Sequence, residues 1–179
     1  MIETWNEVRD GDDRLHSIYE RHYSSRPHRL LRRHWPNWKR ICSPGEHIIL
    51  LSPLCDALFV WVKARIRDDG QEGVNCSVFR NEGHLLSSEL IREAEKWAWD
   101  KWPQERLFTY IDGERTKKRR SKRSLPGECF LQAGWHYVMD GAKPYRSKKG
   151  LYLLEQLWDA LSSRLSNSTG ATTTREKID

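Results

Sequence analysis

Apolar residues recur along this chain with a helical period in some segments and in short continuous runs in others. Residues 13–23 have the helical period, so the sequence predicts a first helix there. The apolar positions of this helix are Leu15, Ile18, Tyr19 and His22. Residues 47–51 and 57–62 are short apolar runs on either side of a Ser-Pro turn, and this arrangement predicts a β-hairpin.

A strand followed by a long helix is the clearest pattern in the middle of the chain. Residues 74–79 predict a strand, and residues 87–102 predict a helix that ends before Pro103. The apolar stripe of this helix consists of Leu90, Ile91, Ala94, Trp97 and Ala98. We expect its charged residues to face water, namely Glu89, Arg92, Glu93, Glu95 and Lys96.

The second half continues the alternation of strands and helices. Residues 107–111 predict a strand and residues 128–133 a short helix, followed by strands at 135–138 and 150–154 and a closing helix at 155–165. This order predicts an α/β (mixed α+β) fold with a central mixed sheet flanked by helices. No apolar run approaches the ~18 residues of a membrane helix, and no signal peptide opens the chain. We therefore expect no membrane partner and a cytoplasmic location.

The length of 179 residues fits one domain, which we expect to span residues 1–165. Two basic loops, residues 26–44 and 113–125, interrupt it, and we expect the Ser/Thr-rich residues 166–179 to form a disordered tail.

The four cysteines are Cys42, Cys55, Cys76 and Cys129. They form no CxxC pair, which argues against a zinc ribbon or a thioredoxin-type site. We expect four buried thiols in a reducing compartment.

Positive charge is concentrated in two segments of a chain whose net charge is +6. Residues 115–123 hold seven Lys and Arg side chains and residues 26–40 hold six, without an acid in either, so the remaining residues are net acidic. Such clusters favour a nucleic acid as partner over a merely solvated loop, because they release counterions from phosphates. The partner that we expect is double-stranded DNA. The expected DNA-binding residues are Arg29, Arg32, Arg33, Trp35, Lys117, Lys118, Arg119, Arg120, Lys122 and Arg123.

Six motifs between about residues 19 and 154 carry a family resemblance. They are His22-Tyr23-Ser24, Pro44-Gly45-Glu46, Phe79-Arg80-Asn81-Glu82, Ser87-Ser88-Glu89-Leu90, Thr109-Tyr110-Ile111-Asp112, and Pro126-Gly127-Glu128-Cys129-Phe130 with Ala133-Gly134-Trp135. In these motifs and their order, the chain resembles the phage-encoded Mom family of DNA-modification enzymes, itself considered similar to the GNAT acyltransferase fold.

The resemblance implies a transferase that attaches a carbamoylmethyl group to the exocyclic amine of adenine in DNA. This modification protects phage DNA from restriction in the host cytoplasm. The enzyme must extrude the base and help remove a proton from the amine. By motif matching, the candidate catalytic residues are His22, Tyr23 and Asp112. The candidate cofactor-binding residues are Arg80, Asn81, Gly83, Ser87 and Ser88.

The resemblance points to acetyl-CoA or another acyl-CoA as donor and leaves the donor unidentified. The turn after the strand at 74–79 departs from the usual Gly-x-Gly phosphate loop, because it contains one glycine, Gly83, next to an acid. We expect no metal site, although iron proposals for the family point to His22 with Asp112. The oligomeric state stays open, with a homodimer among the alternatives.

Two other functions compete with DNA modification. One is an acyl-CoA-dependent GNAT N-acetyltransferase that acts on a protein or a small amine. The other is a non-enzymatic DNA-binding protein on a GNAT scaffold. Each candidate side chain also has a structural alternative: His22 as a core histidine, Arg80 in an ion pair with Glu82 or Glu89, and Asp112 as the cap of a turn.

Overall fold

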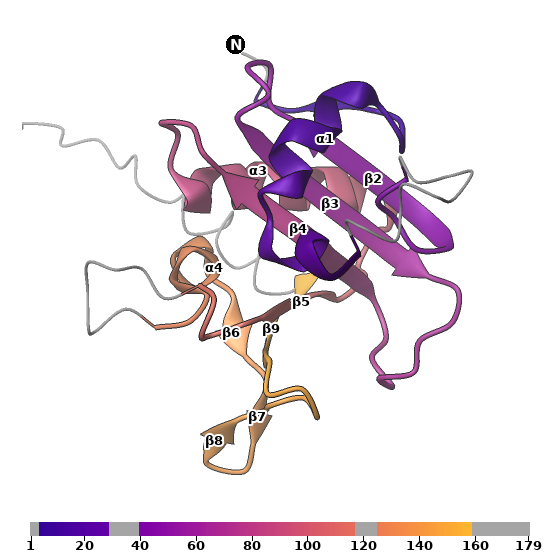
Figure 1. The fold of residues 1–179 in the computed structure, drawn as a ribbon. Coiled ribbons are helices and arrows are strands. Elements are labelled where there is room, and N and C mark those ends of the chain that lie inside the picture. The colour runs from indigo at the N-terminus through magenta and orange to yellow at the C-terminus, as the bar shows by residue number, and fades with distance from the viewer. Residues whose placement is uncertain (1–3, 29–39, 117–124, 159–179) are drawn as a thin grey trace, which may run out of the picture.

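The computed structural model describes residues 4–28, 40–116 and 125–158, which contain a seven-stranded mixed sheet with helices on both faces (Figure 1). In spatial order its strands are β1 (Asn6–Glu7), β2 (Gly45–Leu51), β3 (Ala57–Ala64), β4 (Val74–Asn81), β5 (Leu107–Ile111), β9 (Tyr152–Gln156) and β6 (His136–Tyr137). The helices are α1 (Asp13–Glu20), the 3-10 helix η1 (Tyr23–His28), α3 (Ser87–Lys101) and α4 (Glu128–Ala133). The predicted α/β fold class is confirmed.

Two hydrophobic cores lie on opposite faces of this sheet. Helix α1 packs on one face, and α3 and α4 pack on the other (Figure 1). Strand β2 contributes to both: Ile48 and Leu50 pack in the α3 core, while Ile49 and Leu51 pack in the α1 core. Because the strand is covered on both faces, its sequence is a continuous apolar run rather than an alternating one.

One pair of neighbouring strands is parallel, and it determines where the sheet opens. Strands β4 and β5 pair from Val74 opposite Leu107 to Cys76 opposite Thr109. Beyond Cys76, β4 continues to Asn81 in antiparallel pairing with β3. The carboxyl-terminal half of β4 is therefore not paired with β5. Side chains from other elements can enter the space between the two strands.

The predicted helices at 13–23 and 155–165 need correction. Helix α1 ends at Glu20, and η1 begins at Tyr23, so His22 lies between two helices. Glu155 and Gln156 belong to β9, because they pair with β5 along one edge of that strand. Residues 159–165 lie outside the described part of the chain.

Glu95 does not face water, contrary to the pattern-based expectation. It is completely buried in α3, where its Oε1 accepts a hydrogen bond of 2.5 Å from Trp135 Nε1. The helical period could not show this, because the indole comes from a residue 40 positions later.

The cysteines and three short strands also depart from expectation. Only Cys76 is buried, whereas Cys42, Cys55 and Cys129 are partly exposed. The sequence did not predict strand β1 or the hairpin of β7 (Met139–Asp140) and β8 (Lys143–Pro144), because two-residue strands leave no period to detect. The β7–β8 hairpin lies at the bottom of Figure 1.

No helix in the described ranges is long and apolar enough to cross a membrane.

Candidate functional site

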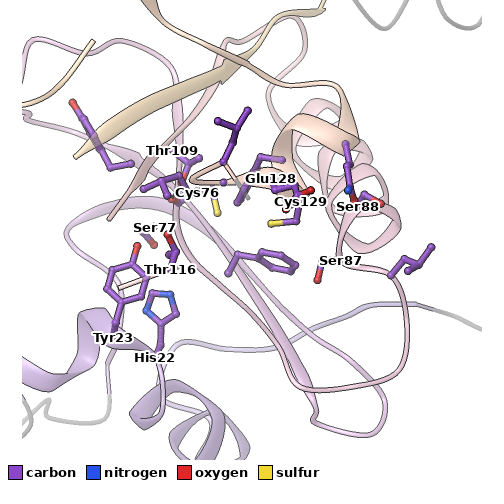
Figure 2. Close-up of a pocket in the computed structure, with 18 of the residues that line it drawn as sticks. His22, Tyr23, Cys76, Ser77, Ser87, Ser88, Thr109, Thr116, Glu128 and Cys129 are labelled. Atoms are coloured by element: carbon purple, nitrogen blue, oxygen red, sulfur yellow. Dashed lines mark hydrogen bonds between the residues drawn. The ribbon is translucent and has the colours of Figure 1, made fainter. Parts of the chain in front are cut away.

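A pocket of about 520 Å³ lies where β4 and β5 separate, between the start of α3 and α4 (Figure 2). Its labelled polar and sulfur-bearing residues are His22, Tyr23, Cys76, Ser77, Ser87, Ser88, Thr109, Thr116, Glu128 and Cys129. This volume is in the range of pockets that bind small molecules and cofactors. The structure thus brings together four of the expected site residues: His22, Tyr23, Ser87 and Ser88.

Local backbone chemistry shapes the pocket walls. Thr109 Oγ1 donates to Cys76 O at 3.0 Å, at the last paired position of β4 and β5. Gly127 opens α4 with a φ of 75°, and a Cβ there would lie 3.1 Å from Ile111 Cγ1. A glycine therefore allows α4 to begin directly against β5 and to close that side of the pocket.

The loop between β4 and α3 is closed by its own hydrogen bonds. Asn81 Oδ1 accepts from the Gly83 backbone N–H at 3.0 Å, and Glu82 N donates to Asp56 O at 2.7 Å. Asn81 Nδ2 donates to Leu85 O and to Ser87 Oγ. Two backbone donors that could hold a coenzyme A pyrophosphate at this loop, Glu82 N and Gly83 N, are thus already used, and Glu82 is an acid. The loop does not fit that group, and Asn81 and Gly83 do not line the pocket.

Arg80 is held away from the pocket by an ion-pair network. Its Nε lies 2.5 Å from Glu82 Oε1, and its Nη1 donates to Arg21 O at 2.7 Å. Arg21 pairs with the same carboxylate. These two guanidinium groups lower the pKa of Glu82 to about 2, the Arg21 hydrogen bond being the largest cause. The ion pair of Arg80 with Glu82 is the structural alternative that the sequence left open, and it fastens the end of α1 to the end of β4.

His22 is a buried, neutral group at one wall of the pocket. Its Nδ1 accepts from the Ser24 backbone N–H at 3.2 Å, and the Ser24 hydroxyl lies 2.7 Å from the same nitrogen. Burial, followed by the charge of Arg80, lowers the pKa of His22 to about 4, although a hydrogen bond to the Phe79 backbone opposes this. At neutral pH the imidazole is uncharged and hydrogen-bonded on both sides, so its geometry suits a residue that positions its neighbours.

Tyr23 lies directly against His22, with ring centroids 4.3 Å apart (Figure 2). Burial raises the pKa of Tyr23 to about 12, with smaller contributions from Cys76 and from the Asp112 carboxylate, while a hydrogen bond to the Asp112 backbone acts in the opposite direction. The phenol therefore keeps its proton at neutral pH. It can donate a hydrogen bond or a proton to a bound molecule but is poorly suited to remove one.

Asp112 is close to Tyr23, but its carboxylate is engaged in a turn. Its Oδ1 accepts from the backbone N–H groups of Glu114 and Arg115 at 3.0 and 3.1 Å. The carboxylate does not line the pocket. The ring nitrogen of His22 and the carboxylate of Asp112 are thus hydrogen-bonded to other protein groups. The pair therefore does not fit the iron that the resemblance implies.

The two basic segments both adjoin the pocket through residues that the structure describes. Thr116 and Leu125, which line the pocket, bound the basic residues 117–124, and η1, which begins at Tyr23, leads into residues 29–39. Arg115 Nη1 donates to Tyr23 O at 3.3 Å and so joins the residues just before 117–124 to the start of η1. The expected DNA contacts Arg29, Arg32, Arg33, Trp35, Lys117, Lys118, Arg119, Arg120, Lys122 and Arg123 lie outside the described residues.

Sequence reasoning overlooked several pocket residues. Glu128 is the acid among the described lining residues, at the start of α4, and Cys129 follows it. Their only signal was the Pro126-Gly127-Glu128-Cys129 motif, which did not reveal the direction of either side chain. Comparisons with protein-family models, curated proteins and solved structures found no match to this chain.

Proposed function

We propose that this protein is a transferase that modifies the exocyclic amine of adenine in double-stranded DNA. The observation that carries the proposal is that the pocket is lined by Thr116 and Leu125, which bound residues 117–124, and by Tyr23, which begins the 3-10 helix leading to residues 29–39. A phosphate backbone held by residues 29–39 and 117–124 would run past the pocket mouth, within reach of an extruded base. The choice of adenine and of a carbamoylmethyl group follows from the resemblance to the Mom family.

The rim of the pocket suits a flipped base. Leu85, Leu86 and Leu125 line it and are 45%, 63% and 59% exposed. Exposed leucines at the mouth of a polar pocket offer an apolar surface on which a base that has left the stack can pack. The labelled polar residues of the pocket include Ser87 and Ser88 on α3, Glu128 on α4 and Tyr23 on η1 (Figure 2).

The proposed chemistry uses two groups on opposite sides of the pocket. The amine nitrogen of adenine forms a bond to the donor carbon, and the leaving group departs with its electron pair. Glu128 takes the amine proton, and Tyr23, whose pKa of about 12 keeps it protonated, donates to the leaving group. His22 positions the Tyr23 ring, and the Asp112 turn holds its hydroxyl.

Nucleoside mass spectrometry of plasmid DNA from expressing cells tests this proposal. We expect a modified adenine with the intact chain and a 10²- to 10⁴-fold lower modification rate with Tyr23→Phe or Glu128→Gln. Tyr137→Phe and Glu89→Gln are matched controls, because Tyr137 donates to the Pro126 carbonyl outside the pocket and Glu89 is exposed on α3. The controls should modify DNA normally.

Two results would replace the proposal with its alternatives. Salt-sensitive DNA binding with unmodified nucleosides would indicate a non-enzymatic DNA-binding protein. Tight coenzyme A binding and acetylation of an amine substrate, without DNA binding, would indicate an N-acetyltransferase. Normal modification by both Tyr23→Phe and Glu128→Gln would remove these side chains from the chemistry.

A further inference from the structure

A second cluster of ligand-forming side chains lies on the opposite side of the sheet from α3. An Asp10 carboxylate oxygen, the Cys42 sulfur and a His47 ring nitrogen all lie within 4.8 Å of one another. The three residues come from different elements: Asp10 from the loop between β1 and α1, Cys42 from the segment before β2, and His47 from β2 itself. None of them lines the pocket described above.

We propose that Asp10, Cys42 and His47 form a binding site for a divalent transition-metal ion, with zinc as the ion that fits best. A thiolate, an imidazole and a carboxylate are borderline-soft ligands that zinc accepts, whereas calcium and magnesium prefer oxygen atoms alone. Three protein ligands leave the fourth tetrahedral position for water. Cys42 binds through its sulfur as a thiolate, and the thiol proton passes to solvent.

Backbone hydrogen bonds hold the Asp10 carboxylate beside Cys42 before any ion binds. Asp10 Oδ1 accepts from Ile41 N at 2.7 Å, and Asp10 Oδ2 accepts from Cys42 N at 3.3 Å. The carboxylate retains lone pairs for a metal, and backbone donors of this kind orient a metal ligand. Val8 N donates to Ile49 O at 2.9 Å, which keeps the Asp10 loop beside β2.

His47 supplies a second, independent indication. Its Nδ1 atom is buried and has no hydrogen-bond partner among the described residues. A buried ring nitrogen without a partner is costly, and a metal bound to the imidazole would relieve that cost directly or through water. His47 also lines a cavity of about 510 Å³ together with Glu7, Val8, Arg9, Asp10 and Arg40, so an ion has a path to the site.

Zinc binding requires only a small movement of the three ligand atoms, and the charges of the ligands balance that of the ion. Zinc bonds of about 2.0–2.3 Å place tetrahedral ligands roughly 3.3–3.8 Å apart, so the three atoms must approach by about 1 Å. A thiolate and a carboxylate together neutralise a divalent ion. The bound metal would then fasten residues 40–42, which follow the basic residues 29–39, to β2 and to the Asp10 loop.

Metal binding by the full chain is the direct test, with Zn²⁺ and Co²⁺ as probes. After treatment with a chelator, we expect one equivalent of Zn²⁺ by native mass spectrometry. At a hundredfold excess over Kd, Zn²⁺ should raise Tm by about 5–10 °C. Co²⁺ should give a thiolate-to-metal charge-transfer absorption in the near ultraviolet, together with tetrahedral visible bands.

Variants identify the ligands. Cys42→Ser should abolish the thiolate absorption, and Cys42→Ser, His47→Gln and Asp10→Asn should each weaken Zn²⁺ binding by roughly 100-fold or more, since loss of outer partners alone costs 10- to 100-fold. Cys55→Ser is the matched control, because Cys55 is a partly exposed thiol outside the cluster. It should bind Zn²⁺ like the unmodified chain.

Three results would overturn the assignment. The first is a Co²⁺ spectrum of the unmodified chain without thiolate absorption, which decides the matter even if a variant fails to fold. The second is Zn²⁺ affinity that stays within threefold in Cys42→Ser and His47→Gln. The third is an equal loss in Cys55→Ser, which would place the ion elsewhere.

Discussion

The buried carboxyl group of Glu95 shows how one side chain can depend on a distant partner. It is fully buried, and Trp135 Nε1 donates to it within the core that also contains Trp61 and Phe130. A buried carboxyl group is costly without hydrogen bonds, and Trp135 Nε1 supplies one to Oε1. The pairing of Glu95 with Trp135 therefore links α3 to the segment that follows α4.

Replacing the indole tests this link. Trp135→Phe removes the N–H donor and leaves space, so we expect the free energy of unfolding to fall by about 2–4 kcal/mol. Trp97→Phe is the control, because Trp97 is partly buried at the edge of the same core and should lose less than about 1.5 kcal/mol. Urea denaturation measures both variants, and equal losses would contradict a special role for the Glu95 contact.

His22 makes stability depend on pH. Its pKa is about 4 in the folded chain and near the ordinary 6.5 when unfolded. The unfolded state therefore binds more protons between these values, and stability falls as pH decreases from 6.5 to 4. The contribution is fully present above pH 6.5 and is on the order of 3 kcal/mol.

Denaturation from pH 4 to 7.5 should show this slope. In His22→Gln, which keeps a donor near the Phe79 backbone, the slope between pH 4 and 6.5 should decrease. His136→Gln measures the effect of removing an exposed imidazole. An unchanged slope in His22→Gln would show that His22 is accessible to protons in the folded chain.

Among the elements, the unit of β4, its loop and α3 determines the site. Gly83 sits where a Cβ would lie 2.4 Å from Asp56 Oδ2, and Asp56 is itself fixed by the Ser52 hydroxyl at 2.6 Å. Glycine is favoured at position 83 because a Cβ would clash with Asp56. Backbone conformation is not the reason, since the φ of Gly83 lies outside the left-handed range. The loop therefore packs tightly against the β2–β3 turn.

A double-mutant cycle measures this packing. Gly83→Ala should destabilise the chain by about 1–3 kcal/mol through the clash with Asp56. In an Asp56→Ala background, which lacks the clashing oxygens, the same change should cost less than about 0.5 kcal/mol. Thermal melts of the four chains give the coupling, and additive effects would mean that the loop moves aside at no cost.

The charge distribution of the whole molecule predicts how DNA binding responds to salt. Replacing Lys117, Lys118, Arg119 and Arg120 by alanine should reduce the slope of log affinity against log salt by about 0.9 for each lost phosphate contact. Alanine at Lys148 and Lys149, two exposed cations between β8 and β9, is the matched control. Fluorescence anisotropy over a salt series measures both slopes. Equal slopes in the two variants would show that residues 117–120 make no phosphate contacts.

Local patterns in the sequence were sufficient for the main elements. The predicted strand at 107–111 and the helix at 128–133 match β5 and α4 at both ends, and the predicted helix at 87–102 differs from α3 by one residue. Each is specified by the period of its own apolar residues and by nearby Pro or Gly. The motif containing Tyr23 and the Ser87-Ser88 pair likewise named true members of the pocket wall.

Contacts between distant segments were decided only by the tertiary structure. The separation of β4 from β5 beyond Cys76, the burial of Glu95 and the convergence of Asp10, Cys42 and His47 each join residues from different elements. A period describes which way a side chain points from its own helix or strand, but not which other element will meet it. For this reason the sequence identified the candidate residues and not their roles. Tyr23 lines the pocket, whereas the side chains of Arg80 and Asp112 are engaged in hydrogen bonds with other protein groups and do not line it.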